Sequence, residues 1–145
     1  MYEVLKETFW ALDKMFTSCQ IDYDELKTLD INEGLFEDYN FVRIVNSFLF
    51  NYSKIQDKMG QKLFKKVLIE LKEIDNENIP FRDVLSILEK LEILDEYIWE
   101  ELREVRNSIA HEYPFDIQER VVNLKNALKG FERLENIYAT IKTNI

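Results

Sequence analysis

The chain has 145 residues, the size of one domain, and 46% of them are hydrophobic, enough to bury a core. Only three glycines and two prolines are present, too few turn residues for an all-β sandwich or barrel, so the composition favours an all-α fold. The formal net charge of −9 disfavours general DNA binding, because an acidic surface repels the phosphate backbone.

The scarcity of cysteine and histidine limits the chemistry that the chain can perform. Cys19 is the only cysteine and His111 the only histidine, so we expect no intramolecular disulfide, no metal site and no cofactor. The N-terminal segment lacks the apolar core of a signal peptide, and no run of residues reaches the length of a membrane span. We therefore expect a soluble cytoplasmic protein, with a single domain over residues 1–145 and no membrane association.

The first predicted helix carries five apolar residues on one face: Leu5, Phe9, Leu12, Phe16 and Cys19. The polar stretch 21–34 then predicts a loop with at most one helical turn, ending at Asn32 to Gly34. The second helix has the clearest pattern, with apolar residues spaced alternately four and three apart at Phe41, Val45, Phe48, Tyr52, Ile55 and Met59.

Gly60 is expected to kink or end the second helix, and apolar residues over 63–71 continue it or start a third. The segment 75–80 ends that element, and Pro80 suits the first turn of a short helix that follows over 84–91.

Asp95 is a possible cap for the next helix, whose apolar face is Ile98, Leu102, Val105 and Ile109. Pro114 should stop this helix near Glu112, and Asp116 with Glu119 fits a capping box that opens a last helix with an apolar seam over 117–141. The sum is an up-and-down bundle of four or five antiparallel helices.

Residues 101–116 carry the side chains best suited to chemistry. Arg106 lies five positions before His111, Asn107 follows it directly, Arg103 lies one helical turn before it, and Tyr113 comes two positions after His111. In an unbroken helix Arg106 and His111 would differ by about 140°, so they would not point at one small group. Either the helix unwinds after Ala110, or it pairs with a copy of itself so that the arginine of one chain meets the histidine of the other.

These residue types suit cleavage of a phosphodiester without a metal. Arg106 can hold a phosphate in bidentate fashion, and His111 can move a proton near neutral pH. RNA supplies its own nucleophile, the 2′-hydroxyl, while Asn107 could orient the imidazole and Tyr113 could stack on a base. The alternative is a purely structural role, in which these residues only cap the end of a helix.

Two basic groups could attract RNA despite the acidic composition. Arg103, Arg106 and Arg120 could form a local positive cleft. A second basic strip, or simply a solvated helix face, comprises Lys54, Lys58, Lys62, Lys65 and Lys66.

The string from Arg106 to Tyr113 resembles the R-x(4–6)-H signature of HEPN domains, and it matches the R-x4-H-x-Y form of HepT-like proteins. The resemblance implies a small helical bundle that forms a homodimer with the motif at the dimer cleft, acting as a metal-independent ribonuclease toxin on RNA, tRNA among the candidates. It further implies Arg106, His111 and Asn107 as catalytic residues, Arg103 and Tyr113 as substrate contacts, and a minimal nucleotidyltransferase antitoxin that modifies Tyr113 with AMP.

Two other interpretations stay open. The chain could be a non-catalytic HEPN subunit that binds a nucleotidyltransferase or a nucleotide, or it could be an unrelated helical bundle with an accidental motif.

Overall fold

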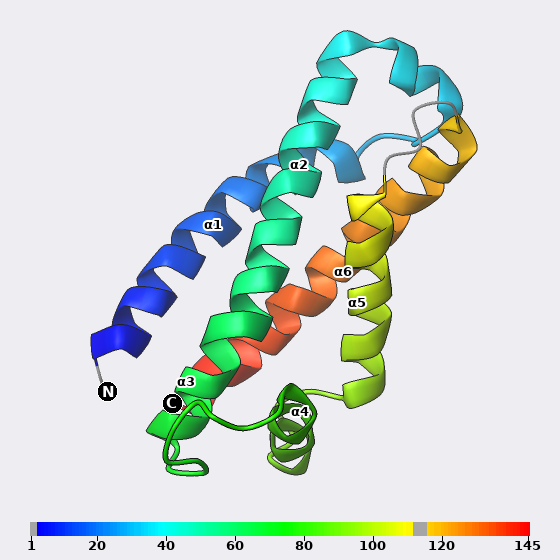
Figure 1. Ribbon diagram of the computed structural model, residues 1–145. Helices are drawn as coiled ribbons and strands as arrows, with labels where there is room; N and C mark the ends of the chain where they lie inside the picture. The colour runs from blue at the N-terminus through cyan, green and yellow to red at the C-terminus, as the bar shows by residue number, and fades with distance from the viewer. Residues whose placement is uncertain (1–2, 112–115) are drawn as a thin grey trace.

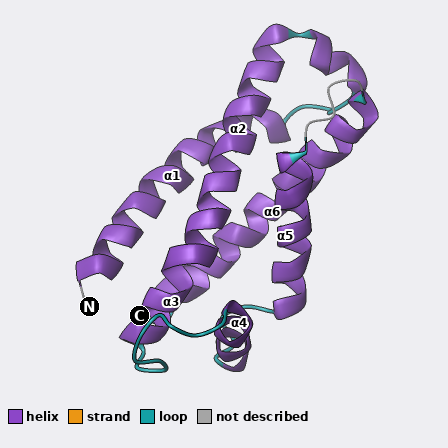
Figure 2. Cartoon of the chain, in the orientation of Figure 1, coloured by secondary structure: helices purple, strands orange, loops and turns teal. Residues whose placement is uncertain are grey.

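The computed structural model describes residues 3–111 and 116–145, and every regular element in these ranges is a helix (Figure 2). The predicted all-α fold is confirmed. The four longest helices run alternately up and down (Figure 1), which is the predicted antiparallel arrangement.

Helix α1 (Glu3–Lys27) extends further than the sequence predicts, because residues 21–27 are helical and not part of a loop. The apolar seam continues past Cys19 through Tyr23 and Leu26, both of which are buried. The Tyr23 ring packs on Phe131 at 5.2 Å between centroids, and its hydroxyl donates to Glu132. The prediction of a loop was wrong for residues 21–27, because tertiary contacts bury two apolar residues within this polar stretch, but residues 28–32 do form a loop.

A short 3-10 turn, η1 (Glu33–Glu37), leads into α2 (Tyr39–Lys58), whose N-terminus is capped by the side chain of Asp38. The six residues of the predicted apolar seam are all buried. At Gly60 the helix does not end, but passes through one π-helical turn, η2 (Met59–Leu63), into α3 (Phe64–Glu70). A Cβ at Gly60 would lie 3.1 Å from the Trp99 ring, so the glycine allows a close approach of that ring.

The second half of the chain follows the predicted order closely. Pro80 precedes the short α4 (Phe81–Lys90), and the Asp95 side chain caps α5 (Glu96–Ala110) by accepting from the backbone N–H groups of Tyr97 and Ile98. The Asp116 side chain accepts from the backbone N–H of Glu119 at 3.0 Å and opens α6 (Ile117–Thr143). Helix α5 ends two residues before the predicted stop, and Glu112 and Pro114 lie outside the described residues.

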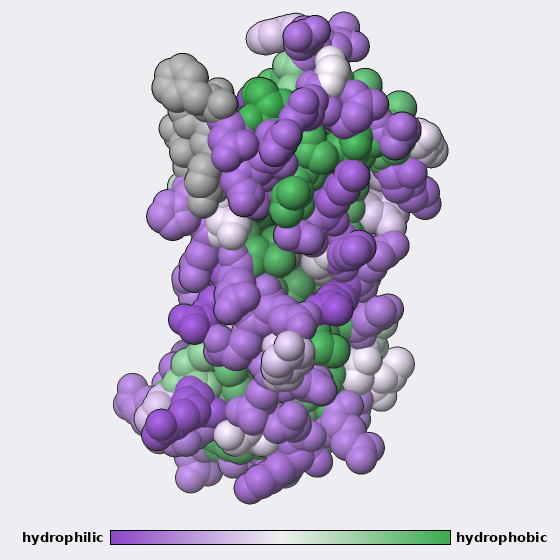
Figure 3. Space-filling model, turned by 90° about the vertical axis from the view of Figure 1, so that its right-hand side faces the viewer, coloured by the Kyte–Doolittle hydropathy of each residue, from purple (hydrophilic) through white to green (hydrophobic). Residues whose placement is uncertain are grey.

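The core fills the space between α1, α2 and α6. Phe131 of α6 lies at its centre, with the rings of Phe16, Tyr23 and Phe48 at centroid distances between 5.2 and 5.9 Å. Within the described ranges, no helix combines the length and the apolar character needed to cross a bilayer. Figure 3 shows the side of the molecule that carries α5, where apolar residues remain visible in an interrupted strip between hydrophilic ones.

Candidate active site

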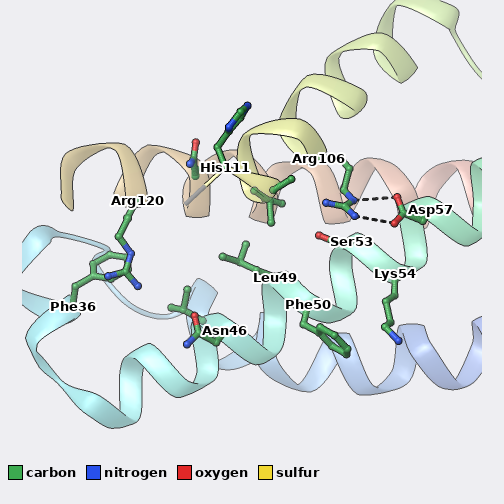
Figure 4. A pocket seen from close by; sticks show the side chains of 14 residues that line it. Phe36, Asn46, Leu49, Phe50, Ser53, Lys54, Asp57, Arg106, His111 and Arg120 are labelled. Atoms are coloured by element: carbon green, nitrogen blue, oxygen red, sulfur yellow. Dashed lines mark hydrogen bonds and ion pairs between the residues drawn. The ribbon is translucent and has the colours of Figure 1, made fainter. Parts of the chain in front are cut away.

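A pocket of about 660 Å³ lies between α2, the C-terminal end of α5, the first turns of α6 and the turn η1. Figure 4 shows the side chains that line it. Its apolar wall includes Phe36, Leu49 and Ile109, and its charged groups are Lys54, Asp57, Arg106 and Arg120, with His111 at the end of α5. Three of the four charged side chains are therefore cationic, in a chain whose net charge is −9.

Arg106 is held by Asp57 of α2 in a bidentate ion pair. The Nε–H donates to Oδ1 at 3.0 Å and an Nη2–H donates to Oδ2 at 2.9 Å. Hydrogen bonding to Asp57 raises the pKa of the Arg106 guanidinium above its ordinary value, against the opposing effect of burial. Arg106 therefore stays cationic at every pH of interest, and one edge of its guanidinium is occupied by the carboxylate.

His111 is the first residue after α5, and its backbone is extended, with φ −78° and ψ 129°. Its N–H still donates to the carbonyl oxygen of Asn107 at 3.2 Å, which closes the last turn. The helix thus ends after Ala110, as one of the two alternatives predicted. Both Arg106 and His111 line the pocket, but in Figure 4 the imidazole points outward, away from Arg106, so the two side chains do not converge within one chain.

Two other residues of the predicted site, Asn107 and Arg103, lie outside the pocket wall. Asn107 is exposed, as is Arg103, whose Nη2 pairs with Glu100 at 2.9 Å. Neither is among the residues that line the pocket. Tyr113 lies outside the described residues.

The cations of the pocket come from both of the predicted basic groups. The Arg120 guanidinium lies 4.7 Å from the centroid of the Phe36 ring, and the Lys54 ammonium lies 4.7 Å from that of Phe50. Of the five lysines in the second strip, only Lys54 lines the pocket. Lys66 instead pairs with Glu77 at 3.2 Å, away from this site.

Sequence reasoning missed Asp57 and Ser53. Both lie on a second face of α2, beside the apolar seam. The residues of this face that line the pocket are at positions 46, 49, 50, 53 and 57, and their helical spacing was the signal in the sequence that could have identified the face. The partner of Asp57 is 49 residues away in sequence, so local pattern could not identify it.

Three side chains of α2 carry buried polar atoms, and one of them, Ser53, lines the pocket. The Tyr52 hydroxyl, the Ser53 Oγ and the Gln56 Oε1 have no hydrogen-bond partner among the described residues. Ser53 is 8% exposed and lines the pocket, close to Arg106 in Figure 4. A bound polar ligand or water there would satisfy a hydroxyl that is otherwise costly to bury.

No cluster of three or more metal-ligating side chains occurs in the described ranges. The positive charge in the pocket comes from arginine and lysine side chains, which suit phosphate groups.

The antiparallel helices form a small all-α domain. Its candidate site lies at the end of α5, where Arg106 and His111 both line the pocket. The family model of Cthe2314-like HEPN domains matches residues 2–144. The chain therefore belongs to the HEPN family, whose domains are generally ribonucleases or related to nucleotide binding. Neither the curated proteins nor the solved structures contained a match.

Proposed function

We propose that this HEPN protein is a metal-independent ribonuclease. The observation that carries the proposal is that Arg106 and His111, the two residues of the family-like motif, line one pocket together with the cations Lys54 and Arg120. A pocket with several cations concentrates phosphate groups even when the remaining surface is acidic.

The reaction uses the 2′-hydroxyl of the RNA itself. The 2′-oxygen bonds to phosphorus, the bond from phosphorus to the 5′-oxygen breaks, His111 accepts the 2′-proton, and water protonates the departing oxygen. The products are a 2′,3′-cyclic phosphate and a 5′-hydroxyl. Arg106 stabilises the charge that develops on the phosphoryl oxygens, through the N–H groups that Asp57 does not occupy.

The active form in this proposal is a homodimer. Arg106 is anchored by Asp57 while the His111 ring points outward, so the histidine of one chain would act on a phosphate held by the arginine of its partner. In the HepT-like version of the proposal, the protein is a toxin, Asn107 and Arg103 support the site at the dimer cleft, and a minimal nucleotidyltransferase silences it by transferring AMP to Tyr113.

Cleavage of total tRNA in the presence of a chelator tests the proposal. We expect the pure protein to cut RNA, and His111→Ala or Arg106→Ala to lower the rate at least about 100-fold. Arg82→Ala, which removes an exposed arginine of α4, is the matched control and should cut normally. The proposal fails if the wild-type chain cuts no cellular RNA and its expression alone does not slow growth.

A second candidate is a non-catalytic subunit that binds a nucleotidyltransferase or a nucleotide. The bidentate Arg106–Asp57 pair favours it, because the carboxylate already occupies one edge of the guanidinium. This candidate predicts a stable complex without nuclease activity, and it is excluded if substitution of His111 removes an activity of the isolated protein.

A further inference from the structure

Two cations in the pocket, Lys54 and Arg120, have no carboxylate partner within residues 3–111 and 116–145. Among the described residues, no aspartate or glutamate lies within ion-pair distance of Lys54 or Arg120, and the interactions of both are with the aromatic rings below them. The chain carries 28 acidic and 19 basic residues, so acidic partners are plentiful elsewhere. Two such cations lining one concave pocket give it a local positive charge, which favours an anion.

Arg106 differs from these two residues in its charge balance. Asp57 neutralises it through two hydrogen bonds, whereas Lys54 and Arg120 form no ion pair with a carboxylate in the part of the chain that the structure describes. The attraction of the pocket for a polyanion must therefore come mainly from Lys54 and Arg120, neither of which belongs to the Arg106–His111 motif.

An apolar wall separates Lys54 from Arg120 in the pocket. In Figure 4 Arg120 lies over Phe36 at one end of the pocket, Lys54 lies near the opposite end, and Leu49 lies between them. The Ser53 hydroxyl, buried and without a partner in the described part of the chain, adds a donor to this wall. Separated anion sites with apolar surface between them fit the alternating phosphates and bases of a single strand.

We propose that Lys54 and Arg120 bind the backbone phosphates that flank the scissile one, and so set the affinity for single-stranded RNA. This inference rests on the proposed ribonuclease function and names the residues that hold its substrate. The rings of Phe50 and Phe36 lie 4.7 Å from the charged groups of Lys54 and Arg120, and these cation–π contacts favour the side-chain positions seen in the pocket. Lys54 and Arg120 therefore act on binding, while Arg106 and His111 act on the chemical step.

Binding of a labelled 2′-O-methyl RNA oligonucleotide tests the inference without cleavage, since its nucleophile is blocked. We expect Lys54→Ala and Arg120→Ala each to weaken binding about tenfold. Each should also reduce the slope of log K against log salt by about 0.7, the value for one phosphate contact on a single strand. Arg120→Lys keeps the charge and should retain the slope. Lys125→Ala and Arg82→Ala remove exposed charges outside the pocket and are the matched controls.

Cleavage of unmodified RNA supplies the second readout. The Lys54 and Arg120 variants should raise KM about tenfold with kcat changed less than twofold, whereas His111→Ala lowers kcat. If each variant has the same thermal unfolding temperature as the wild type, loss of fold is excluded as the cause of the change in KM.

The outcomes separate the two proposals. If the wild type cuts RNA but the Lys54 and Arg120 variants bind and cut like the controls, this inference alone is overturned. If the wild type binds the oligonucleotide through Arg120 but cuts nothing, the RNA site is supported and the ribonuclease proposal fails. If polyglutamate competes as well as RNA does, or if no RNA binds, the RNA site is overturned.

Discussion

The bidentate contact between Arg106 and Asp57 is the most specific pairing of individual residues in the site. It joins α5 to α2 and fixes the orientation of the guanidinium. The two side chains are 30% and 39% exposed, so solvent screens their attraction and its contribution to stability is small. The pair therefore matters more for the direction of the Arg106 side chain than for the free energy of unfolding.

A double-mutant cycle measures this pair. We expect Asp57→Ala to lower the free energy of unfolding by about 1 kcal/mol, and the coupling with Arg106→Ala to be about 0.5–1 kcal/mol. Urea denaturation of the wild type, both single variants and the double variant gives the four values. Strictly additive effects would show that the pair contributes no net stability.

At the scale of the helices, one glycine decides how closely α6 approaches α2. A Cβ at Gly130 would overlap the Tyr52 hydroxyl oxygen and would lie 3.1 Å from the ring atoms Cε2 and Cζ. Tyr52 is fully buried, and its hydroxyl has no hydrogen-bond partner among the described residues. Glycine is required here for space, since its backbone is helical.

We expect Gly130→Ala to lower the free energy of unfolding by about 1–3 kcal/mol, although alanine is the better helix former. Tyr52→Phe removes a buried hydroxyl for which the described residues offer no partner, so this variant should be as stable as the wild type or more stable. The double variant should recover part of the loss, because the oxygen that the new methyl group meets is gone. Thermal and urea unfolding of the three variants provide the comparison, and a Gly130→Ala protein more stable than the wild type would contradict the packing argument.

At the scale of the whole molecule, burial between α1 and α2 affects how stability depends on pH. The Cys19 thiol is fully buried and donates weakly to the carbonyl oxygen of Phe48 at 3.8 Å. Burial, followed by the nearby carboxylates of Asp22 and Glu135, raises the pKa of Cys19 from 9.0 to about 12. The unfolded chain therefore loses this proton before the native state does.

We expect stability to be insensitive to Cys19 below about pH 9 and to fall between pH 9 and 12, by about 1 kcal/mol per pH unit in mid-range. Cys19→Ala should be less stable at neutral pH but should show a flatter dependence between pH 9 and 10. Urea unfolding across this range, at constant ionic strength, checks the difference in slope. Equal slopes for the two proteins would show that the thiol is not responsible.

Much of the fold followed from local pattern. The alternating spacing from Phe41 to Met59 predicted a buried helix face, and Asp95 and Asp116 predicted the starts of α5 and α6. These signals are local because a cap bonds within its own first turn and a seam repeats every turn. The extension of α1 was missed because the burial of Tyr23 depends on Phe131, more than a hundred residues later.

The sequence alone determined the all-helical class, the antiparallel order of the helices and the segment that carries Arg106 and His111, because periodicity, caps and one rare histidine are local properties. The tertiary structure decided that Asp57 holds Arg106, that the two motif side chains point apart, and that Lys54 and Arg120 are the cations without carboxylate partners in the described pocket. Those facts depend on how α2, α5 and α6 pack together, and residues on different helices meet only when the core between them is formed.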